Sequence, residues 1–244
     1  MTIIASSAAA AAAPLIAPII RQSDTSAALI AAARLLLNDL EHGRRIDAQA
    51  LRAAMTSAFN GSDAAGAWDW KTAYDACEAA TVIFLRKFGP AMRARTASPI
   101  AMLPMLEKVA ALLPTHTRRS EESQALQQYS TPIGLGFAAA CAAGITHGDL
   151  VLEPSAGTGL LAILAELAGG GLVLNEIGQT RCELLTHLFP DTPVTRHDAA
   201  HIHDHLDADV RPTVVLMNPP FSVAAHVEGR VADAALRHVS SALA

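Results

Sequence analysis

The chain has 244 residues, which is long enough for one large domain or two modest ones, each with a core of useful size. Hydrophobic residues make up 51% of it and charged residues 17%, which excludes a disordered chain and predicts a helix-rich globular protein. The formal net charge of −5, from 18 Lys and Arg against 23 Asp and Glu, gives no basic excess to drive binding to phosphate backbones, so this chain alone is expected to bind nucleic acid weakly.

Residues 1–22 form an apolar stretch rich in Ala and Pro. The first basic residue, Arg21, follows the apolar run instead of preceding it, and Pro14 and Pro18 interrupt any helical span. We therefore predict a disordered tail and not a signal peptide. No other long apolar run occurs, and the three cysteines stand far apart without a CxxC pair. These features predict a cytoplasmic protein with buried thiols and no membrane partner.

The next segment, residues 23–114, has apolar positions at helical spacing throughout and predicts an all-α bundle domain. Capping residues and glycines divide it into helices over 23–43, 47–61, from near 69 to the Gly89–Pro90 pair, and 98–114. The aromatic residues of the third helix could form a stacking platform for a base or a cofactor, but aromatics on an amphipathic helix are usually core, and we favour that interpretation.

Residues 115–128 are polar and predict a linker into a second domain, residues 129–244. There the pattern alternates between short apolar runs and amphipathic helices. The runs are "DLVLEP" (149–154), "LVLNE" (172–176), "PVTRHD" (193–198) and "TVVLMNPP" (213–220). Such alternation is typical of βαβ units and predicts a doubly wound α/β domain with a mostly parallel sheet, whose ligands bind at the carboxyl ends of the strands.

The motif "EPSAGTG", Glu153–Gly159, follows the first predicted strand and begins a helix. Gly157 and Gly159 allow a tight turn and a close approach of the backbone to a ligand. Glu176 ends the second predicted strand at the spacing expected of a ribose-binding acid. These two motifs fit a nicotinamide dinucleotide and S-adenosylmethionine equally well.

Two further strand ends favour S-adenosylmethionine. Asp198 closes the third strand, where a carboxylate can accept a hydrogen bond from an adenine amino group. Asn218, Pro219, Pro220 and Phe221 close the fourth. The Asn218 side-chain oxygen and the Pro219 carbonyl can accept from a planar amine and localise its lone pair, while Phe221 can stack on its ring. The prolines hold this corner in one shape and leave its carbonyls free.

In this order and spacing, "EPSAGTG", the acid of "LVLNE", "HD" and "NPPF" resemble the motifs of amino-group methyltransferases, above all the adenine-N6 DNA methyltransferases. "QQYSTP" before the first strand resembles their additional cofactor motif. The resemblance implies a Rossmann-like methyltransferase sheet, catalysis at Asn218–Phe221, and S-adenosyl-L-methionine as cofactor. Its implied binding residues are Ser130, Thr131, Pro132, Glu153, Pro154, Ser155, Gly157, Gly159, Glu176 and Asp198. Of these, Ser130 to Pro132, Glu153 and the glycines would surround the methionine portion, Glu176 the ribose and Asp198 the adenine.

The helical half is similar to the amino-terminal region of bacterial strawberry-notch-like proteins, in which a methyltransferase-like domain precedes a superfamily 2 helicase. That resemblance rests on "AFNGSDAAGAWDWKTAYDACEAA" and "LLPTHTRRSEESQALQQYSTP". It implies two partners, nucleic acid (DNA favoured) and a carboxyl-terminal helicase region of the same polypeptide.

Only four strands are readable before the chain ends in a helix, whereas a complete methyltransferase sheet has more. We therefore expect the sheet to be truncated after its fourth strand, which would pair with residues beyond Ala244. The histidine-rich stretch 196–209 could bind a metal ion if helical, but a solvated loop and helix is favoured, since methyl transfer requires no metal.

These inferences predict a methyltransferase domain that acts on an exocyclic amine of a nucleic acid base, adenine N6 of DNA favoured. Two alternatives stay open. One is a protein glutamine methyltransferase, and the other is a catalytically silent module that binds S-adenosylmethionine or DNA and positions a helicase.

Overall fold

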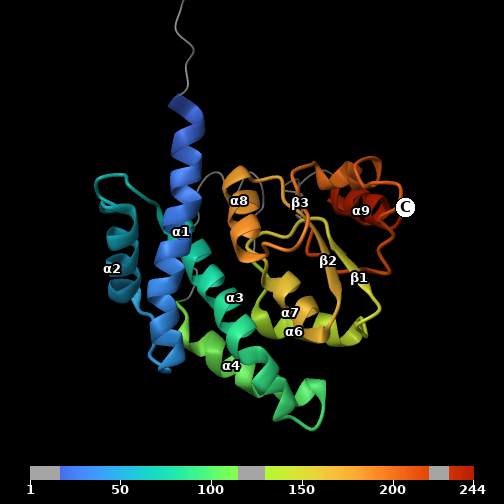
Figure 1. The fold of residues 1–244 in the computed structure, drawn as a ribbon, viewed down its shortest axis with the longest axis horizontal. Helices are drawn as coiled ribbons and strands as arrows, with labels where there is room; N and C mark the ends of the chain where they lie inside the picture. The colour runs from blue at the N-terminus through green and yellow to red at the C-terminus, as the bar shows by residue number, and fades with distance from the viewer. Residues whose placement is uncertain (1–16, 115–129, 220–230) are drawn as a thin grey trace, which may run out of the picture.

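The computed structural model describes residues 17–114, 130–219 and 231–244, which form a mixed α/β fold with many helices and a small four-stranded parallel sheet (Figure 1). The helical half comprises α1 (Ala17–Glu41), α2 (Ala48–Phe59), α3 (Trp70–Ala94), a 3₁₀ turn η1 (Pro99–Met102) and α4 (Leu103–Leu112). The second half, called the sheet half below, comprises α6 (Ile133–Ala142), β1 (Leu150–Glu153), α7 (Leu160–Ala168), β2 (Gly171–Asn175), α8 (Gln179–Leu188), β3 (Val194–Thr195), η2 (Ala199–Asp204), β4 (Val214–Val215) and α9 (Val231–Ala242).

The first helix begins earlier than its sequence pattern predicts. Residues 1–22 were expected to be a disordered tail, but α1 already starts at Ala17. Pro18 does not prevent this, because proline is tolerated in the first helical turn, where its missing N–H would have no intrahelical partner. The preceding part of the predicted tail, residues 1–16, lies outside the described residues.

The other helix starts follow local capping chemistry. Asp47 accepts hydrogen bonds from the backbone N–H groups of Gln49 and Ala50, and Asp69 accepts one from Thr72. Each carboxylate satisfies donors that the first turn would otherwise leave without partners. The predicted starts of α2 and α3 are thereby confirmed.

The predicted end of α3 at Gly89 and Pro90 is wrong, since the helix continues through both residues to Ala94. Packing against α7 explains the difference. A Cβ atom on Gly89 would lie 2.6 Å from Cδ1 of Leu167, and Arg93 donates a hydrogen bond to the Leu167 carbonyl. The close approach of the two helices thus offsets the hydrogen bond that proline removes from the helix interior.

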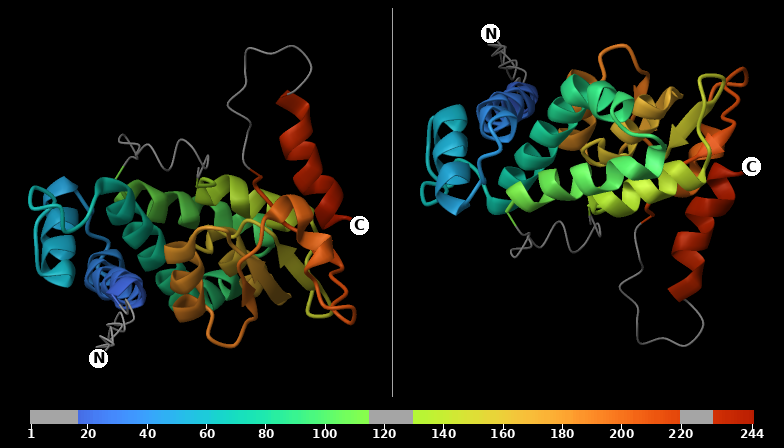
Figure 2. Two further views of the ribbon diagram at one scale, coloured as in Figure 1. Left: turned by 90° about the horizontal axis from the view of Figure 1, so that it is seen from above. Right: turned by 90° about the horizontal axis from the view of Figure 1, so that it is seen from below.

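The four strands are all parallel and lie in the order β3-β2-β1-β4. Helix α7 packs against β1 and β2, and α8 packs against β3. β3 and β4 each span only two residues, so the third and fourth predicted strands are shorter than their apolar runs. Within the described residues β4 forms one edge of the sheet. Figure 2 shows α1 and α2 at one end of the molecule and α9 at the other.

The hydrophobic core runs without a break from the helical half into the sheet half. Helix α3 packs against α1 and α7, and α1 also packs directly against α8 (Figure 1). Leu36 of α1 and Leu85 of α3 belong to the same buried cluster as Ile163 of α7 and Leu185 of α8. The division into a helical domain and an α/β domain stays a prediction, and its linker, residues 115–128, lies outside the described residues.

The aromatic residues near α3 are part of this core. Trp68 and Tyr74 are buried, and Trp70 and Phe84 pack against the cluster, which confirms the core interpretation. In the described parts of the chain, no helix combines the length and the apolar character needed to cross a bilayer.

Candidate functional site

The carboxyl ends of the parallel strands share one edge of the sheet, and the segments that follow β1 and β4 meet there in a pocket. Its volume is about 330 Å³ including its open mouth. The lining residues are Ser130, Thr131, Glu153, Ser155, Ala156, Gly157, Thr158, Leu160, Leu161, Arg181 and Asn218. The pocket thus brings together several predicted cofactor residues and the predicted catalytic Asn218.

The glycine loop, residues 154–159, joins β1 to α7, and its two glycines serve different purposes. Gly159 has a φ of +87°, and a Cβ atom there would lie 2.5 Å from Cε2 of Phe189, so it is needed for packing. Gly157 has a φ of +58°, but a Cβ atom there would meet nothing nearer than Nη1 of Arg181 at 3.9 Å. A side chain at Gly157 would therefore cost backbone strain and reduce the space of the pocket without disturbing the core.

Glu176 holds the loop instead of lining the pocket. Its Oε2 accepts a hydrogen bond from the backbone N–H of Gly157 at 2.8 Å, and its Oε1 accepts one from Gly178 at 2.7 Å. Glu176 therefore contacts the glycine loop directly. Its binding of a ribose hydroxyl stays a prediction.

Asn175 is a buried residue that the sequence interpretation missed. Its Nδ2 donates to the carbonyls of Pro154 and His197, at 2.9 and 3.0 Å, and its Oδ1 accepts from the His197 N–H and the Thr195 hydroxyl. This one amide joins the segments that follow β1 and β3 to the end of β2. The only available signal was a polar residue at the end of an otherwise apolar strand.

Glu153 ends β1 with its side chain almost fully buried. Burial raises the pKa of this carboxyl well above its usual range, the negative charge of Glu176 adds to the effect, and a hydrogen bond with the backbone of Ala162 opposes it. Among the described residues, no hydrogen-bond partner reaches Oε2 of Glu153. The pocket therefore contains a buried carboxyl group that favours its neutral form.

Asn218 is oriented by Thr131, whose hydroxyl oxygen accepts a hydrogen bond from Nδ2 of the amide at 3.0 Å. Thr131 and Ser130 come just before α6, and Pro132 precedes the first residue of that helix. Pro219 follows Asn218 directly. Pro220 and Phe221 lie outside the described residues.

A second, larger opening adjoins this pocket and shares Ser130, Thr131 and Leu160 with it. It has a volume of about 1400 Å³ including open solvent, and residues of α4 and α6 contribute to its largely apolar lining.

The structure places Asp198 differently from its prediction. β3 ends at Thr195, and Asp198 caps η2 by accepting a hydrogen bond from the Ala200 N–H at 2.9 Å. Asp198 is exposed and does not line the pocket. The expectation that it closes the strand is wrong, because pairing with β2 stops at Thr195 and the chain turns into a 3₁₀ helix.

The neighbouring histidines do not share one helical face, because His201 departs from helical geometry inside η2. The rings of His197 and His205 stack with their centroids 4.1 Å apart. Within the described residues, no group of three or more His, Cys, Asp or Glu side chains could hold a metal ion.

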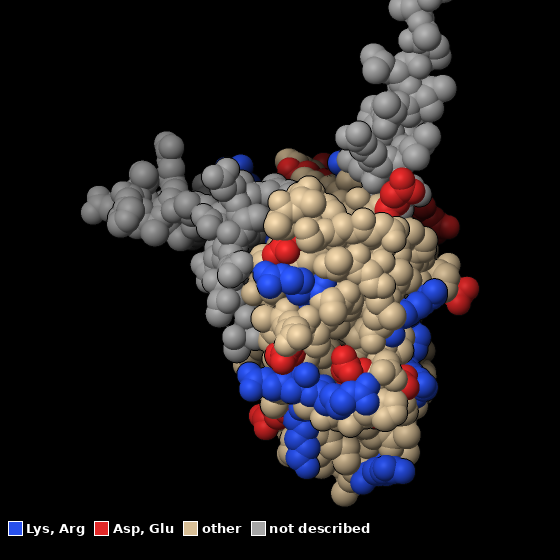
Figure 3. Space-filling view, turned by 90° about the vertical axis from the view of Figure 1, so that its left-hand side faces the viewer, with Lys and Arg blue, Asp and Glu red and all other residues tan. Residues whose placement is uncertain are grey.

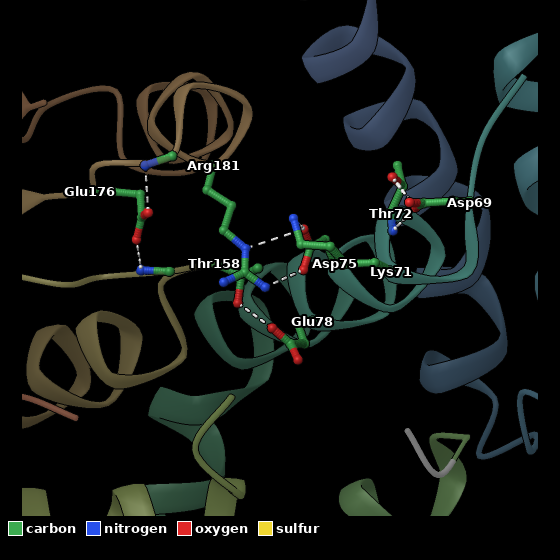
Figure 4. Close-up of polar contacts among 10 residues, drawn as sticks. Asp69, Lys71, Thr72, Asp75, Glu78, Thr158, Glu176 and Arg181 are labelled. Atoms are coloured by element: carbon green, nitrogen blue, oxygen red, sulfur yellow. Dashed lines mark hydrogen bonds and ion pairs between the residues drawn. The ribbon is translucent and has the colours of Figure 1, made fainter. Parts of the chain in front are cut away.

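A buried polar network connects α3 to the glycine loop and α8 (Figure 4). Asp75 forms a two-pronged ion pair with Arg181, and Glu78 accepts a hydrogen bond from the Thr158 hydroxyl at 2.6 Å. Nζ of Lys71 lies 3.8 Å from Oδ2 of Asp75. The sequence interpretation missed this network, although two acids three residues apart on an apolar helix were a signal, since buried charges require partners.

Figure 3 shows the side of the molecule where α1 and α2 lie, with Lys and Arg interleaved with Asp and Glu. Ion pairs of the helical half join Arg44 to Asp39, Arg52 to Asp63 and Lys87 to Glu41. This mixed charge does not add to the case for a phosphate-binding surface.

No protein-family model matches the chain, and no curated protein matches it.

Proposed function

We propose that the chain carries an S-adenosylmethionine-dependent methyltransferase domain that acts on an exocyclic amine of a nucleic acid base, adenine N6 of DNA favoured. The observation that carries this proposal is the composition of the pocket at the carboxyl edge of the sheet. The glycine loop after β1 and the amide of Asn218 after β4 line the same pocket, although they are distant in the sequence. Methyl transfer requires the methyl donor and the acceptor amine to be held close together, and a cofactor loop next to an amine-binding amide would do this.

The pocket residues fit the amino-acid end of this cofactor. Glu153 offers a buried oxygen that has no partner among the described residues and can accept from an ammonium group. Gly157 leaves its side of the pocket open to a close backbone approach. When bound, S-adenosylmethionine supplies a methyl group activated by a positively charged sulfur.

Asn218 would bind the acceptor amine. Its Nδ2 donates to Thr131, which fixes the plane of the amide. Its amide oxygen would accept an amine hydrogen. The Pro219 carbonyl would accept the second hydrogen. Together the two acceptors would localise the nitrogen lone pair and orient it for attack. Pro220 would stiffen the corner formed by residues 218–221, and Phe221 would stack on the ring of the acceptor base.

Further parts of the proposal rest on the sequence motifs alone. Glu176 would bind the ribose hydroxyls, and Asp198 the adenine of the cofactor. The resemblance to strawberry-notch-like proteins supports a helicase region of the same polypeptide as a partner, with DNA as the shared substrate.

The test is transfer of a tritiated methyl group from S-adenosylmethionine by the full chain to DNA, RNA and protein. We expect transfer to DNA, and a loss of roughly 100-fold or more in kcat for Asn218→Ala, because one interaction with the reacting group disappears. Asn38→Ala, at an exposed position on α1, is the matched control and should retain full activity.

The other outcomes separate the alternatives. Transfer to a glutamine side chain would replace the nucleic acid substrate with a protein. Binding of S-adenosylmethionine without transfer to any substrate would indicate a silent module. Transfer that persists in Asn218→Ala would refute the assigned catalytic corner.

A further inference from the structure

Arg181 is a buried arginine whose function in the pocket the sequence motifs do not assign. It lies in α8, and its side chain is only 8% exposed. Nε donates to Oδ2 of Asp75 at 3.2 Å, and Nη2 donates to Oδ1 of Asp75 at 2.7 Å. Such a two-pronged pair holds the planar guanidinium in one orientation.

The third guanidinium nitrogen is directed toward the glycine loop. Figure 4 shows Nε and Nη2 joined to Asp75 and the remaining nitrogen turned away from it. This atom, Nη1, is the nearest atom to the position that a Cβ atom would take on Gly157, at 3.9 Å. Both Arg181 and Gly157 line the pocket, so the guanidinium presents N–H donors at its wall.

The pocket therefore combines a cationic donor with an acceptor. Arg181 supplies N–H groups of fixed positive charge, and Glu153 supplies a buried carboxyl oxygen without a partner among the described residues. An α-amino acid group, with its carboxylate and its ammonium, is complementary to this combination. A purely apolar ligand would match neither group, and a simple cation would match only Glu153.

We propose that Arg181 binds the α-carboxylate of the ligand's amino-acid portion, and that Asp75 of α3 is the positioning residue that aims the guanidinium. This inference rests on the proposed function, since S-adenosylmethionine carries such a group. It also assigns a role to the helical half, because the residue that orients the ligand-binding arginine belongs to α3.

Calorimetric titration with two ligands tests the inference. S-adenosylhomocysteine and its decarboxylated analogue differ only in the α-carboxylate. We expect the wild-type chain to bind S-adenosylhomocysteine at least about tenfold more tightly, which is the effect of one charge-assisted hydrogen bond. In Arg181→Met this ratio should fall close to one, while the affinity for the decarboxylated analogue should change little.

Arg86→Met is the matched control. Arg86 also extends from α3 to the sheet half, where it pairs with Glu166 of α7, but it does not line the pocket. The ratio of the two ligand affinities in Arg86→Met should equal that of the wild type. Circular dichroism checks that each variant is folded. If Arg181→Met does not fold, Arg181→Lys provides the measurement. Its single ammonium group would be shared between Asp75 and the ligand carboxylate. The ratio of the two affinities should therefore lie between the wild-type value and one.

The outcomes distinguish the two proposals. If both ligands bind and the ratio in the Arg181 variants equals that of the wild type, the assignment of Arg181 is wrong while the proposed function stands. If neither ligand binds the wild-type chain, the proposed function fails and this inference fails with it.

Discussion

Glu153 shows how one residue links the pocket to the stability of the fold. Its carboxyl is buried at the end of β1, and its pKa in the folded chain is raised well above the usual value of 4.5, first by burial and then by the charge of Glu176. The folded state therefore binds this proton more tightly than the unfolded state does. The stabilisation from the protonated form is fully present below pH 4.5 and is lost as the pH rises through the raised pKa.

Glu153→Gln should change the pH dependence of stability, because glutamine has a similar shape and never ionises. The wild type should lose stability as the pH rises from 5 to 8, and the variant should lose less, so the difference between the two free energies of unfolding should shift in favour of the variant over this range. Urea denaturation at both pH values measures the difference. If the two proteins show parallel pH dependence, Glu153 titrates in the folded chain as it does in water.

Asn175 shows what a single buried amide can do when all its groups are used. Its four hydrogen bonds hold the chain just after β1 and β3 in contact with the end of β2. None of these partners is adjacent in the sequence, so helical or strand periodicity carries no information about them. The residue is identifiable only once the strands lie side by side.

At the scale of the elements, α3 connects the two halves of the molecule. Its Asp75 and Glu78 extend toward Arg181 of α8 and Thr158 of the glycine loop. The ion pair between Asp75 and Arg181 is buried on both sides. A buried pair contributes little net stability when formed, but removing one partner leaves an uncompensated charge in the interior.

Asp75→Ala should therefore lower the free energy of unfolding by about 3–5 kcal/mol, because Arg181 would remain charged and lose its main partner. The double variant Asp75→Ala/Arg181→Met should be more stable than Asp75→Ala, because it removes both charges. Denaturant unfolding of the wild type, Asp75→Ala and the double variant gives the three free energies of unfolding. A double variant that is no more stable than Asp75→Ala would contradict this account.

Asp39→Ala is the matched control for that series. Asp39 also pairs with an arginine, but its partner Arg44 has a side chain that is 51% exposed. Water screens such a pair and keeps its side chains mobile, so the loss should be under about 1 kcal/mol.

At the scale of the whole molecule, the core is shared. Buried residues of α1 and α3 belong to one cluster with those of α7, α8 and the sheet. The ion pair between Arg86 and Glu166 also joins α3 to α7, and Arg86 donates to the Leu188 carbonyl at the end of α8. Because each half covers apolar surface of the other, we expect neither half to unfold alone.

The two halves should therefore lose their structure at the same urea concentration. Both tryptophans of the chain, Trp68 and Trp70, report on the helical half. Cys182 of α8 reports on the sheet half when the other two cysteines are replaced by alanine. Tryptophan fluorescence and thiol labelling should give coincident midpoints. Separate midpoints would instead support two independent domains with a boundary near residues 115–128.

The sequence by itself determined much of the local structure and the location of the glycine loop and of Asn218. Apolar runs alternating with amphipathic helices correctly predicted a parallel sheet, and the glycine loop and Asn218 both line the pocket at its carboxyl edge. These inferences succeeded because periodicity and capping act between near neighbours. The carboxyl edge of a parallel sheet then places the motifs together whatever the identity of the remaining residues.

Only the tertiary structure decided the features that depend on distant partners. Helix α3 passes through Gly89 and Pro90 because α7 packs closely against it, and Arg181 enters the pocket because Asp75 of α3 orients it. Asp198 caps a turn because β3 stops pairing early. At Gly89 and Pro90 a contact between residues far apart in the chain outweighed a local preference, because close packing against α7 offsets the helix hydrogen bond that proline removes.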